Sequence, residues 1–498
     1  MTHFHHPTRR RSDPSALLVR KSALIFALTL ALSSAFLAIS SSRVVTNARA
    51  QNFTATLELS PSTVKIGDTV AVTGTGYAAN SDVDLVYHTV IGRYELTNRT
   101  EFVGQRYDET TQVLTTVKAD KDGNISGEIT VPTGFGGPHD IRGVVAEVET
   151  SQAGLFIQPT VTMSPSSGPV GTAIELRIEG VDLRTKVNTW QILYDNHYVG
   201  FASAVTTNGL AIARFRAAGP VGTRVVQAWN NAYNSTPYLA WDTSPFRDDF
   251  KVPETFTFEV TDDSGYLEPK MDDLSANDDP WPLDQSYPGT LSLSVDRGAV
   301  GDATTLSGSN LPPDAELTLT WWTMVGNRVS GVGFSEEPID LGTVTTGADG
   351  TFTREMTIPD DLGGNHRIEA MAGDEVVGGV NLMIIPSLVS ISPTTVKAGD
   401  EIEIHLKGLG WTTYDNTYTV VYDNSHIGYV CGFSTNGDVV FKMLVTGDPG
   451  THLIDLYPTI YKGDEPTPKT FSVPQLSYAD DHPMRPIPAI HLSIEIVG

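Results

Sequence analysis

The sequence contains the same short pattern twice, 228 positions apart. Tyr194-Asp195-Asn196 is followed by Gly200, and Tyr422-Asp423-Asn424 is followed by Gly428. Further along, each copy continues into Thr-Asn-Gly, at 207–209 and at 435–437. A fixed offset held over many positions is typical of an internal duplication. The chain is therefore expected to contain at least two copies of one larger unit.

A second pattern divides each copy of the larger unit into two smaller units. Four stretches begin with a serine in a short apolar run and have a glycine seven positions later. Nine positions after that glycine, each has a Gly or Asn at which we expect the chain to turn a corner. The corners are Gly76, Gly180, Asn310 and Gly408. Glycine and asparagine adopt positive φ most easily, so we expect a left-handed backbone at each corner. The first and third units also share features at an offset of 227, such as His139 and His366. The order is thus A-B-A′-B′.

The local pattern predicts strands throughout. After residue 50, short runs of Val, Ile, Leu, Tyr and Thr alternate with Gly, Pro, Asn and Asp, and no stretch has the period of an amphipathic helix. The 498 residues are also too many for one hydrophobic core. We therefore predict an all-β chain of several domains. The expected segments are a signal peptide 1–50, domain A 51–157, domain B 158–260, a linker 261–288, domain A′ 289–385, domain B′ 386–475 and a tail 476–498.

The first fifty residues have the features of an export signal. Arg9, Arg10, Arg11, Arg20 and Lys21 precede an apolar run from 22 to 40, and Ala-Arg-Ala at 48–50 offers a cleavage site before residue 51. A run of this length also suits an uncleaved membrane anchor, and this alternative stays open. Either way, the sequence predicts a secreted, periplasmic or surface location.

The net charge limits which partners the chain can bind, and the cysteine count limits which disulfides it can form. Removing residues 1–50 takes away seven of the 33 basic and one of the 59 acidic residues, which leaves a formal charge of −32. Such an acidic chain is unsuited to nucleic acid or to anionic membranes, so we expect neither as a partner. Cys431 is the only cysteine, so no intramolecular disulfide can form and each domain depends on its core.

Two segments outside the four units invite specific hypotheses. The segment 261–288 is acidic and contains several prolines, which predicts an extended linker. Its carboxylates are weak candidates for a calcium site, because calcium prefers several oxygen ligands; these are Asp272, Asp273, Asp278 and Asp279. The tail ends in an apolar alternation at 489–498, similar to the first strand of a fifth unit. An unpaired strand would need a partner edge, so self-assembly through 489–498 is a third hypothesis for function.

The units resemble the immunoglobulin-like β-sandwich repeats of bacterial exported proteins, including those of the IPT/TIG type. The resemblance is carried by Ser-Pro-x5-Gly openings, by the Tyr-Asp-Asn hairpin, and by Pro-Gly-Thr-His-Leu-Ile at 449–454, and it covers residues 55–475. It implies a tandem array of four immunoglobulin-like sandwiches. In that family such repeats serve as spacers, adhesion modules or companions of enzymes, so the resemblance implies fold more than function.

Candidate site residues are few. The sequence has no nucleophile elbow, phosphate loop or dinucleotide fingerprint, and its histidines lack metal-ligand spacing, so we expect neither an enzyme nor a histidine-based metal site, and no cofactor beyond the calcium considered above. Asp-Asn in each twin is expected to turn a hairpin. Aromatic side chains are candidates for binding surface glycans or other surface proteins; they are Trp229, Trp241, Trp321 and Trp322. The first hypothesis is a non-catalytic structural, spacer or adhesion protein, and carbohydrate binding is the alternative.

Overall fold

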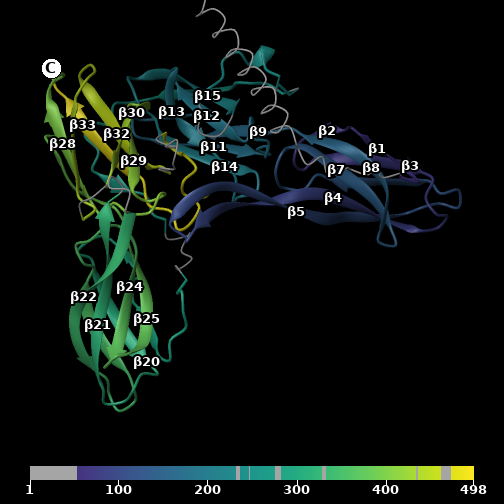
Figure 1. Ribbon diagram of the computed structural model, residues 1–498. Helices are drawn as coiled ribbons and strands as arrows, with labels where there is room; N and C mark the ends of the chain where they lie inside the picture. The colour runs from purple at the N-terminus through teal and green to yellow at the C-terminus, as the bar shows by residue number, and fades with distance from the viewer. Residues whose placement is uncertain are drawn as a thin grey trace, which may run out of the picture. The chain divides into compact units, whose positions relative to one another are not determined.

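The computed structural model describes residues 53–231, 236–245, 247–248, 250–274, 282–327, 333–432, 436–460 and 473–498. The expected signal peptide 1–50 therefore lies outside the described residues. The described chain is built from β-strands, with one short 3-10 turn, η1 (Trp241–Thr243). None of the described residues forms a helix long and apolar enough to cross a membrane. The all-β prediction is confirmed (Figure 1).

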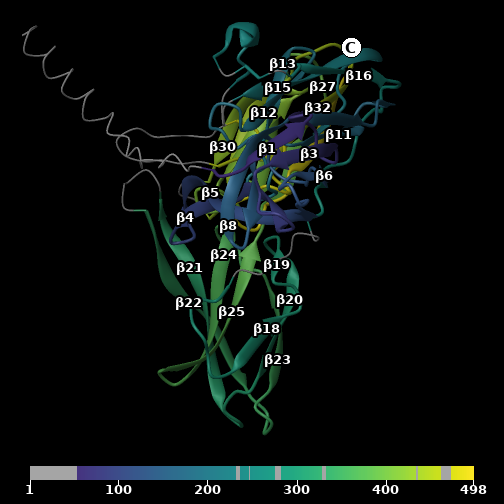
Figure 2. The same ribbon diagram turned by 90° about the vertical axis from the view of Figure 1, so that its right-hand side faces the viewer.

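Four sandwiches follow one plan, and all of them belong to one compact unit, Ala55–Gly498. Each pairs a three-stranded sheet with a larger sheet, and in each a two-residue strand runs parallel to the last strand of the sandwich. Figure 2 shows the two layers in A′, where β18, β20 and β23 lie on one side and β21, β22, β24 and β25 on the other. The chain is a tandem array of immunoglobulin-like β-sandwiches.

The first two domains contain the following strands. Domain A has the sheet β1 (Thr56–Ser60), β3 (Thr69–Thr75), β6 (Ile125–Thr130) and the sheet β2 (Thr63–Val64), β8 (Val148–Ile157), β7 (Gly137–Val145), β4 (Asp82–Thr97), β5 (Glu101–Lys118). Domain B has the sheet β14 (Leu210–Arg216), β11 (Ala173–Glu179), β9 (Thr160–Ser164) and the sheet β10 (Ser167–Gly168), β16 (Glu254–Val260), β15 (Gly222–Asn231), β12 (Thr189–Tyr194), β13 (His197–Ala202).

The last two domains repeat this order. Domain A′ has the sheet β18 (Thr290–Leu293), β20 (Ala303–Ser309), β23 (Phe352–Thr357) and the sheet β19 (Arg297–Gly298), β25 (Glu375–Ile384), β24 (Gly364–Ala372), β21 (Glu316–Asn327), β22 (Gly333–Thr345). Domain B′ has the sheet β26 (Ser387–Ser392), β28 (Glu401–Lys407), β31 (Val439–Leu444) and the sheet β17 (Lys270–Met271), β33 (Ile490–Ile496), β32 (Gly450–Pro458), β29 (Thr417–Tyr422), β30 (Ser425–Cys431), with β27 (Thr395–Val396) paired to β33.

The predicted start of a fifth unit is wrong. Residues 490–496 form β33, which pairs antiparallel with β32 along its whole length and parallel with β27 at its end. Its alternate side chains are buried in the core of B′; they are Ile490, Leu492, Ile494 and Ile496. The strand is therefore the last strand of the fourth sandwich, and the chain offers no unpaired strand there for self-assembly.

The predicted linker is also more ordered than expected over its described part. Lys270 and Met271 form β17 on the edge of the B′ sheet, where they pair with His491 and Ile490. Upstream, the Leu267 N–H donates to Ser493 Oγ at 2.7 Å, and Ser493 Oγ–H donates back to the Leu267 carbonyl at 2.8 Å. Residues 267–271 thus contact β33 of B′, whereas Thr261, Asp262 and Asp263 remain exposed.

The predicted backbone corners are confirmed. Gly76, Gly180, Asn310 and Gly408 have φ values of 86°, 73°, 55° and 73°. In the twin hairpins, Asp195 and Asn196 have φ of 48° and 63°, and Asp423 and Asn424 have 45° and 61°. Two successive left-handed residues define a type I′ turn, which matches the twist of the strands it joins.

Candidate functional site at the junction of domains B and B′

The twin hairpins fix the position of the loop beside them through the same hydrogen bonds. The Tyr194 hydroxyl donates to the Ala218 carbonyl at 2.9 Å, and the Tyr422 hydroxyl donates to the Thr446 carbonyl at 2.7 Å. Both acceptors stand 24 positions after their tyrosine. Burial raises the pKa of both phenols, which therefore remain neutral donors at physiological pH.

The aspartates of the twins bind the neighbouring strand in the same way. Asp195 accepts from the Val225 N–H at 2.8 Å and pairs with Arg224 at 3.1 Å. Asp423 accepts from the Leu453 N–H at 2.9 Å, and its other oxygen lies 2.5 Å from His452 Nδ1. Burial lowers the pKa of His452, but the hydrogen bond and charge of Asp423 outweigh it and raise that pKa overall.

The two twins line one cavity of about 360 Å³ between B and B′. Asp195, Asp423, Arg224 and His452 all face it, together with Asp263 from the segment after domain B. Asp263 Oδ1 accepts from the Thr451 N–H at 3.2 Å. Because three of these carboxylates already accept backbone N–H groups, the cavity is a polar joint between two domains rather than an array of free acids and bases.

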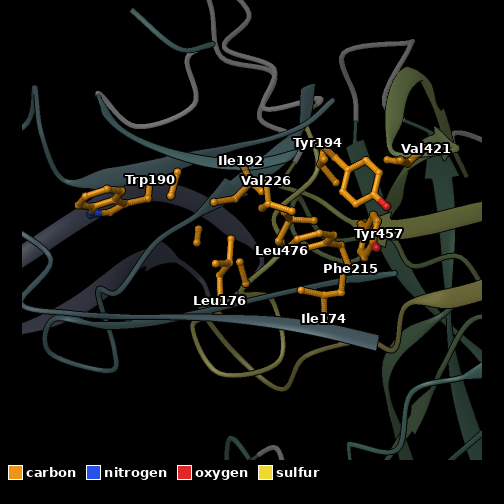
Figure 3. Close-up of a cluster of buried hydrophobic side chains, with 14 of the residues drawn as sticks. Ile174, Leu176, Trp190, Ile192, Tyr194, Phe215, Val226, Val421, Tyr457 and Leu476 are labelled. Atoms are coloured by element: carbon orange, nitrogen blue, oxygen red, sulfur yellow. The ribbon is translucent and has the colours of Figure 1, made fainter. Parts of the chain in front are cut away.

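A segment of B′ is inserted into domain B. The Phe201 N–H donates to the Pro474 carbonyl at 2.9 Å, the Leu476 N–H donates to the Phe201 carbonyl at 2.7 Å, and the Arg214 N–H donates to the Leu476 carbonyl at 3.0 Å. Leu476 thereby bridges β13 and β14, the edges of the two sheets of B. We name residues 474–478 the strap. Figure 3 shows Leu476 and Tyr457 of B′ beside Phe215, Val226 and Tyr194 of B.

Asp481, just after the strap, is fully buried and accepts from three residues of two other domains. Its carboxylate accepts from Val205 N–H at 3.0 Å, from Thr206 N–H at 2.8 Å and hydroxyl at 2.9 Å, and from the Tyr94 hydroxyl at 2.9 Å. Tyr94 belongs to domain A. The stretch that the sequence presented as a tail thus holds A and B against B′.

The same stretch continues to domain A′. Arg485 pairs with Asp296 at 3.2 Å, and the Arg297 guanidinium donates to the Pro486 carbonyl. Between them and Asp481, His482 is buried, with Nδ1 3.0 Å from the Met484 carbonyl. Burial lowers the pKa of His482 to about 4, so the ring is neutral at pH 7.

A second buried cluster joins B, B′ and the segment between the blocks. Arg216 Nε donates to Asp455 Oδ1 at 2.8 Å, and Asp455 lies 2.5 Å from His491 Nδ1. His491 Nε2 lies 3.1 Å from Asp272. Burial raises the pKa of Asp455, but Arg216 and His491 outweigh it, so this pKa is lowered overall. Burial likewise lowers the pKa of His491, and its two carboxylate partners raise it to about 9.

The long β4–β5 hairpin of A also enters this junction (Figure 1). The Phe102 N–H donates to Thr413 Oγ1 at 2.6 Å, and the Tyr414 hydroxyl donates to the Arg99 carbonyl at 2.5 Å. Tyr94 and Phe102 share a small apolar core with Tyr414. The hairpin therefore packs on B′, more than 300 positions away in sequence.

The structure separates the four candidate tryptophans. Trp321 is fully buried in the core of A′, where Nε1 donates to Asp361 at 2.7 Å. Trp241 is buried in domain B. A soluble glycan can reach neither ring. Trp322, which donates to Glu369 at 2.7 Å, and Trp229 are only partly buried, but they belong to A′ and B respectively. The four tryptophans do not meet in one site.

Of the four calcium candidates, only Asp272 and Asp273 lie among the described residues. Asp272 lies against the protonated ring of His491, Asp273 follows it on the same segment, and Asp278 and Asp279 lie outside the described residues. Within the described parts of the chain, no group of three or more His, Cys, Asp or Glu side chains is arranged to hold a metal ion.

Sequence analysis missed the residues that the junction depends on. Asp481, Asp455, His491 and Arg216 belong to no recognisable motif. Arg216 and Asp455 are 239 positions apart, and Asp481 and Tyr94 are 387 positions apart. Asp455 and His491 each lie within an apolar strand pattern, and this was the one signal available in the sequence. A charged side chain in a strand that is buried needs a polar partner, so each residue could have been predicted to have one.

Comparison with known proteins gives fold-level similarity only. No protein-family model matches the chain, and no curated protein matches it. Among solved structures it is similar to the ICAM-5 D1-D4 ectodomain fragment, with 12% identity over 89% of this chain and 100% of that one and a TM-score of 0.20. It is also similar to the Yersinia pseudotuberculosis adhesin InvE, with 16% identity over 46% of this chain and 58% of that one and a TM-score of 0.15.

A putative membrane anchored protein of Corynebacterium diphtheriae is a third similar structure. Its identity is 12% over 67% of this chain and 89% of that one, with a TM-score of 0.17. At these identities and TM-scores the similarity carries no argument about function.

Proposed function

We propose that this chain is an exported, non-catalytic protein with a structural or adhesion role at or outside the cell surface. The export signal, the acidic surface charge and the array of four immunoglobulin-like domains support this proposal together. The observation that carries it is the use of the buried polar groups. Asp481, Asp455 and His491 are all committed to contacts between domains, so they hold the array together instead of facing a substrate.

The location is tested by protease treatment of intact cells that produce the full chain. We expect antibody against domain A to detect the protein in the medium or the envelope, and external protease to remove the envelope-bound form without cell lysis. A chain found only in the cytoplasm would contradict the proposal.

The non-catalytic role is tested in a deletion strain with an adhesion or envelope defect. His197 and Asp448 line the cavity without belonging to the two aspartate-strand contacts. We expect the double variant His197→Ala, Asp448→Ala to restore the defect as well as the unaltered chain does. Loss of restoration with normal protein level and folding would indicate chemistry in the cavity.

Carbohydrate binding is a second candidate function, favoured by one observation. The Trp322 ring is only partly buried on the outer face of A′, and the Arg367 guanidinium carbon lies 4.8 Å from its centroid. Arg367 lies over one face of this ring, so a sugar would have to stack on the opposite face. Binding to a glycan array that disappears in Trp322→Ala and persists in Trp229→Ala would support it.

A further inference from the structure

The B and B′ sandwiches differ at one edge, although they share one fold and one register. In B, the strap bridges the last strands of the two sheets, β13 and β14, through the backbone of Phe201 and Arg214. In B′, β30 and β31 are the corresponding last strands of their sheets. Among the described residues, no segment forms backbone hydrogen bonds with the outer edge of β30 at Tyr429 or of β31 at Lys442. We name β30 and β31 together the open edge.

The backbone of the open edge points outward in the same register as the covered edge in B. Phe201 pairs with Gln191, and Tyr429 pairs with Thr419, each 228 positions later. Arg214 pairs with Glu175, and Lys442 pairs with Glu403, again 228 positions later. Because successive residues of a strand direct their N–H and C=O groups to opposite sides, Tyr429 and Lys442 present the groups that Phe201 and Arg214 use for the strap.

Within the described parts of the chain, space is also free at the open edge. A Cβ added to Gly200 would lie 2.5 Å from the Pro474 carbonyl, whereas the equivalent Gly428 has no heavy atom within 4 Å of such a Cβ. The side chains of Ile427 and Tyr429 are 53% and 48% exposed, and those of Val440 and Leu444 are 54% and 64% exposed. β30 also lies near β13, and these side chains nevertheless remain accessible.

The core beneath the open edge is less covered than its counterpart. Ala202, Ala213 and Phe215 of B are 0–2% exposed below the strap. Their equivalents in B′ are Val430, Phe441 and Met443, and all three are only partly buried. Val430 and Phe441 are larger than the alanines they replace, so they fill part of the space that Leu476 occupies in B. An added segment therefore needs a smaller apolar residue than leucine at this position.

We propose that the open edge of B′ binds an extended apolar segment from a partner protein by strand addition. The first residue of the segment accepts from the Tyr429 N–H. The third residue donates to the Tyr429 carbonyl, accepts from the Lys442 N–H, and places a small apolar side chain between the sheets. A second copy of this chain cannot supply its own strap, because Gln475, Leu476, Ser477 and Tyr478 are buried in its own domain B. Exposed sheet edges are a recognised site for peptide addition.

The test uses the full chain and a synthetic peptide with the sequence Val-Pro-Gln-Val-Ser-Tyr-Ala, which is 473–479 with Val in place of Leu476. A photoreactive group replaces its tyrosine, and cross-links are mapped by mass spectrometry. We expect cross-links within Ile427–Cys431 and Val439–Leu444. Tyr429→Pro removes one N–H from an edge where proline is tolerated, and should weaken binding about tenfold. Tyr429→Ala keeps the N–H and should weaken it by no more than about threefold.

Melting temperatures and a second pair of variants provide two further tests. Both variants should melt within a few degrees of the unaltered chain, since the altered groups face solvent, and Lys442→Pro compared with Lys442→Ala repeats the comparison on β31. Cross-links elsewhere, or equal binding by the proline and alanine variants, would overturn the proposal. So would a dimer in light scattering that Tyr429→Pro converts to a monomer, because the edge would then pair with a second copy.

Discussion

At the scale of single residues, Asp481 is the acid on which the junction depends most. It is fully buried and accepts two backbone N–H groups and two hydroxyls. Replacing it with alanine leaves the N–H groups of Val205 and Thr206 buried without acceptors, at about 1–3 kcal/mol each. We expect Asp481→Ala to lower the free energy of unfolding by about 3–5 kcal/mol, measured by urea denaturation.

The adjacent acid is a matched control for that substitution. Asp480 pairs with Arg214, and both side chains are partly exposed, at 27% and 35%. Ion pairs in contact with solvent contribute about 0–1 kcal/mol. Asp480→Ala should therefore lower the free energy of unfolding by less than about 1 kcal/mol. Equal losses for the two variants would show that Asp481 does not anchor the interdomain contact.

His491 makes stability depend on pH. Its pKa is about 9 in the folded chain, against an ordinary value of 6.5. The folded state therefore binds the proton more tightly, so this contribution is complete below about pH 6.5 and is lost as the pH rises through 9. The shift corresponds to roughly 3 kcal/mol. Urea denaturation at pH 6.5 and pH 9.5 should show this loss.

His491→Gln is the control for the pH effect. It removes the titrating ring, so the loss of unfolding free energy between pH 6.5 and pH 9.5 should shrink by most of that amount. The contributions of lysines and tyrosines to the pH dependence remain. An unchanged pH difference in this variant would place the effect elsewhere. The lowered pKa of Asp455 has the opposite effect on the pH dependence of stability, because the stability that it contributes is lost as the pH falls below about 4.

At the scale of elements, the twin hairpins were predictable and their partners were not. Asp-Asn between two apolar runs predicts a type I′ turn from backbone preference alone, and the φ values confirm it. The contact of Asp195 with Val225 depends on the ladder between β12 and β15, which no local pattern specifies. The same applies to the strap, whose apolar residues look like those of any surface connection until domain B is in place.

The type I′ turn of the first hairpin leads to a specific prediction for Asn196. This exposed residue has φ of 63°, which asparagine and glycine tolerate and β-branched residues do not. Asn196→Val should lower the free energy of unfolding by about 1–2 kcal/mol, while Asn196→Gly should change it by less than about 1 kcal/mol. Thermal unfolding measures both. Similar melting temperatures for the two variants would argue against the left-handed turn.

At the scale of the whole molecule, the repeat predicted the fold but placed the last strand in the wrong unit. Glu254 of β16 and Ile490 of β33 begin equivalent strands, yet they are 236 positions apart instead of 228. The offset therefore grows by eight residues between β32 and β33, in the connection that contains the strap. The alternating pattern of β33 is the same for a first and a last strand of a sandwich, so only the pairing with β32 decides its place.

Because β33 is the last strand of B′, deleting residues 490–498 should affect the whole of that domain. Four apolar side chains of this strand are buried in the core of B′, and β32 loses its antiparallel neighbour. Each buried Leu or Ile contributes about 1.5–3 kcal/mol, so their sum approaches or exceeds the stability of a typical domain. Deletion should therefore unfold B′ and, because His491 is removed with the strand, leave Asp455, Arg216 and Asp272 without it. Hydrogen exchange should then show lost protection in β29 and β32 but not in β7 or β8 of domain A. Deleting only residues 497–498 should leave all of these strands protected, because β33 stays intact. A truncated chain in which β32 keeps its protection would mean that β33 is an accessory strand and that B′ folds without it.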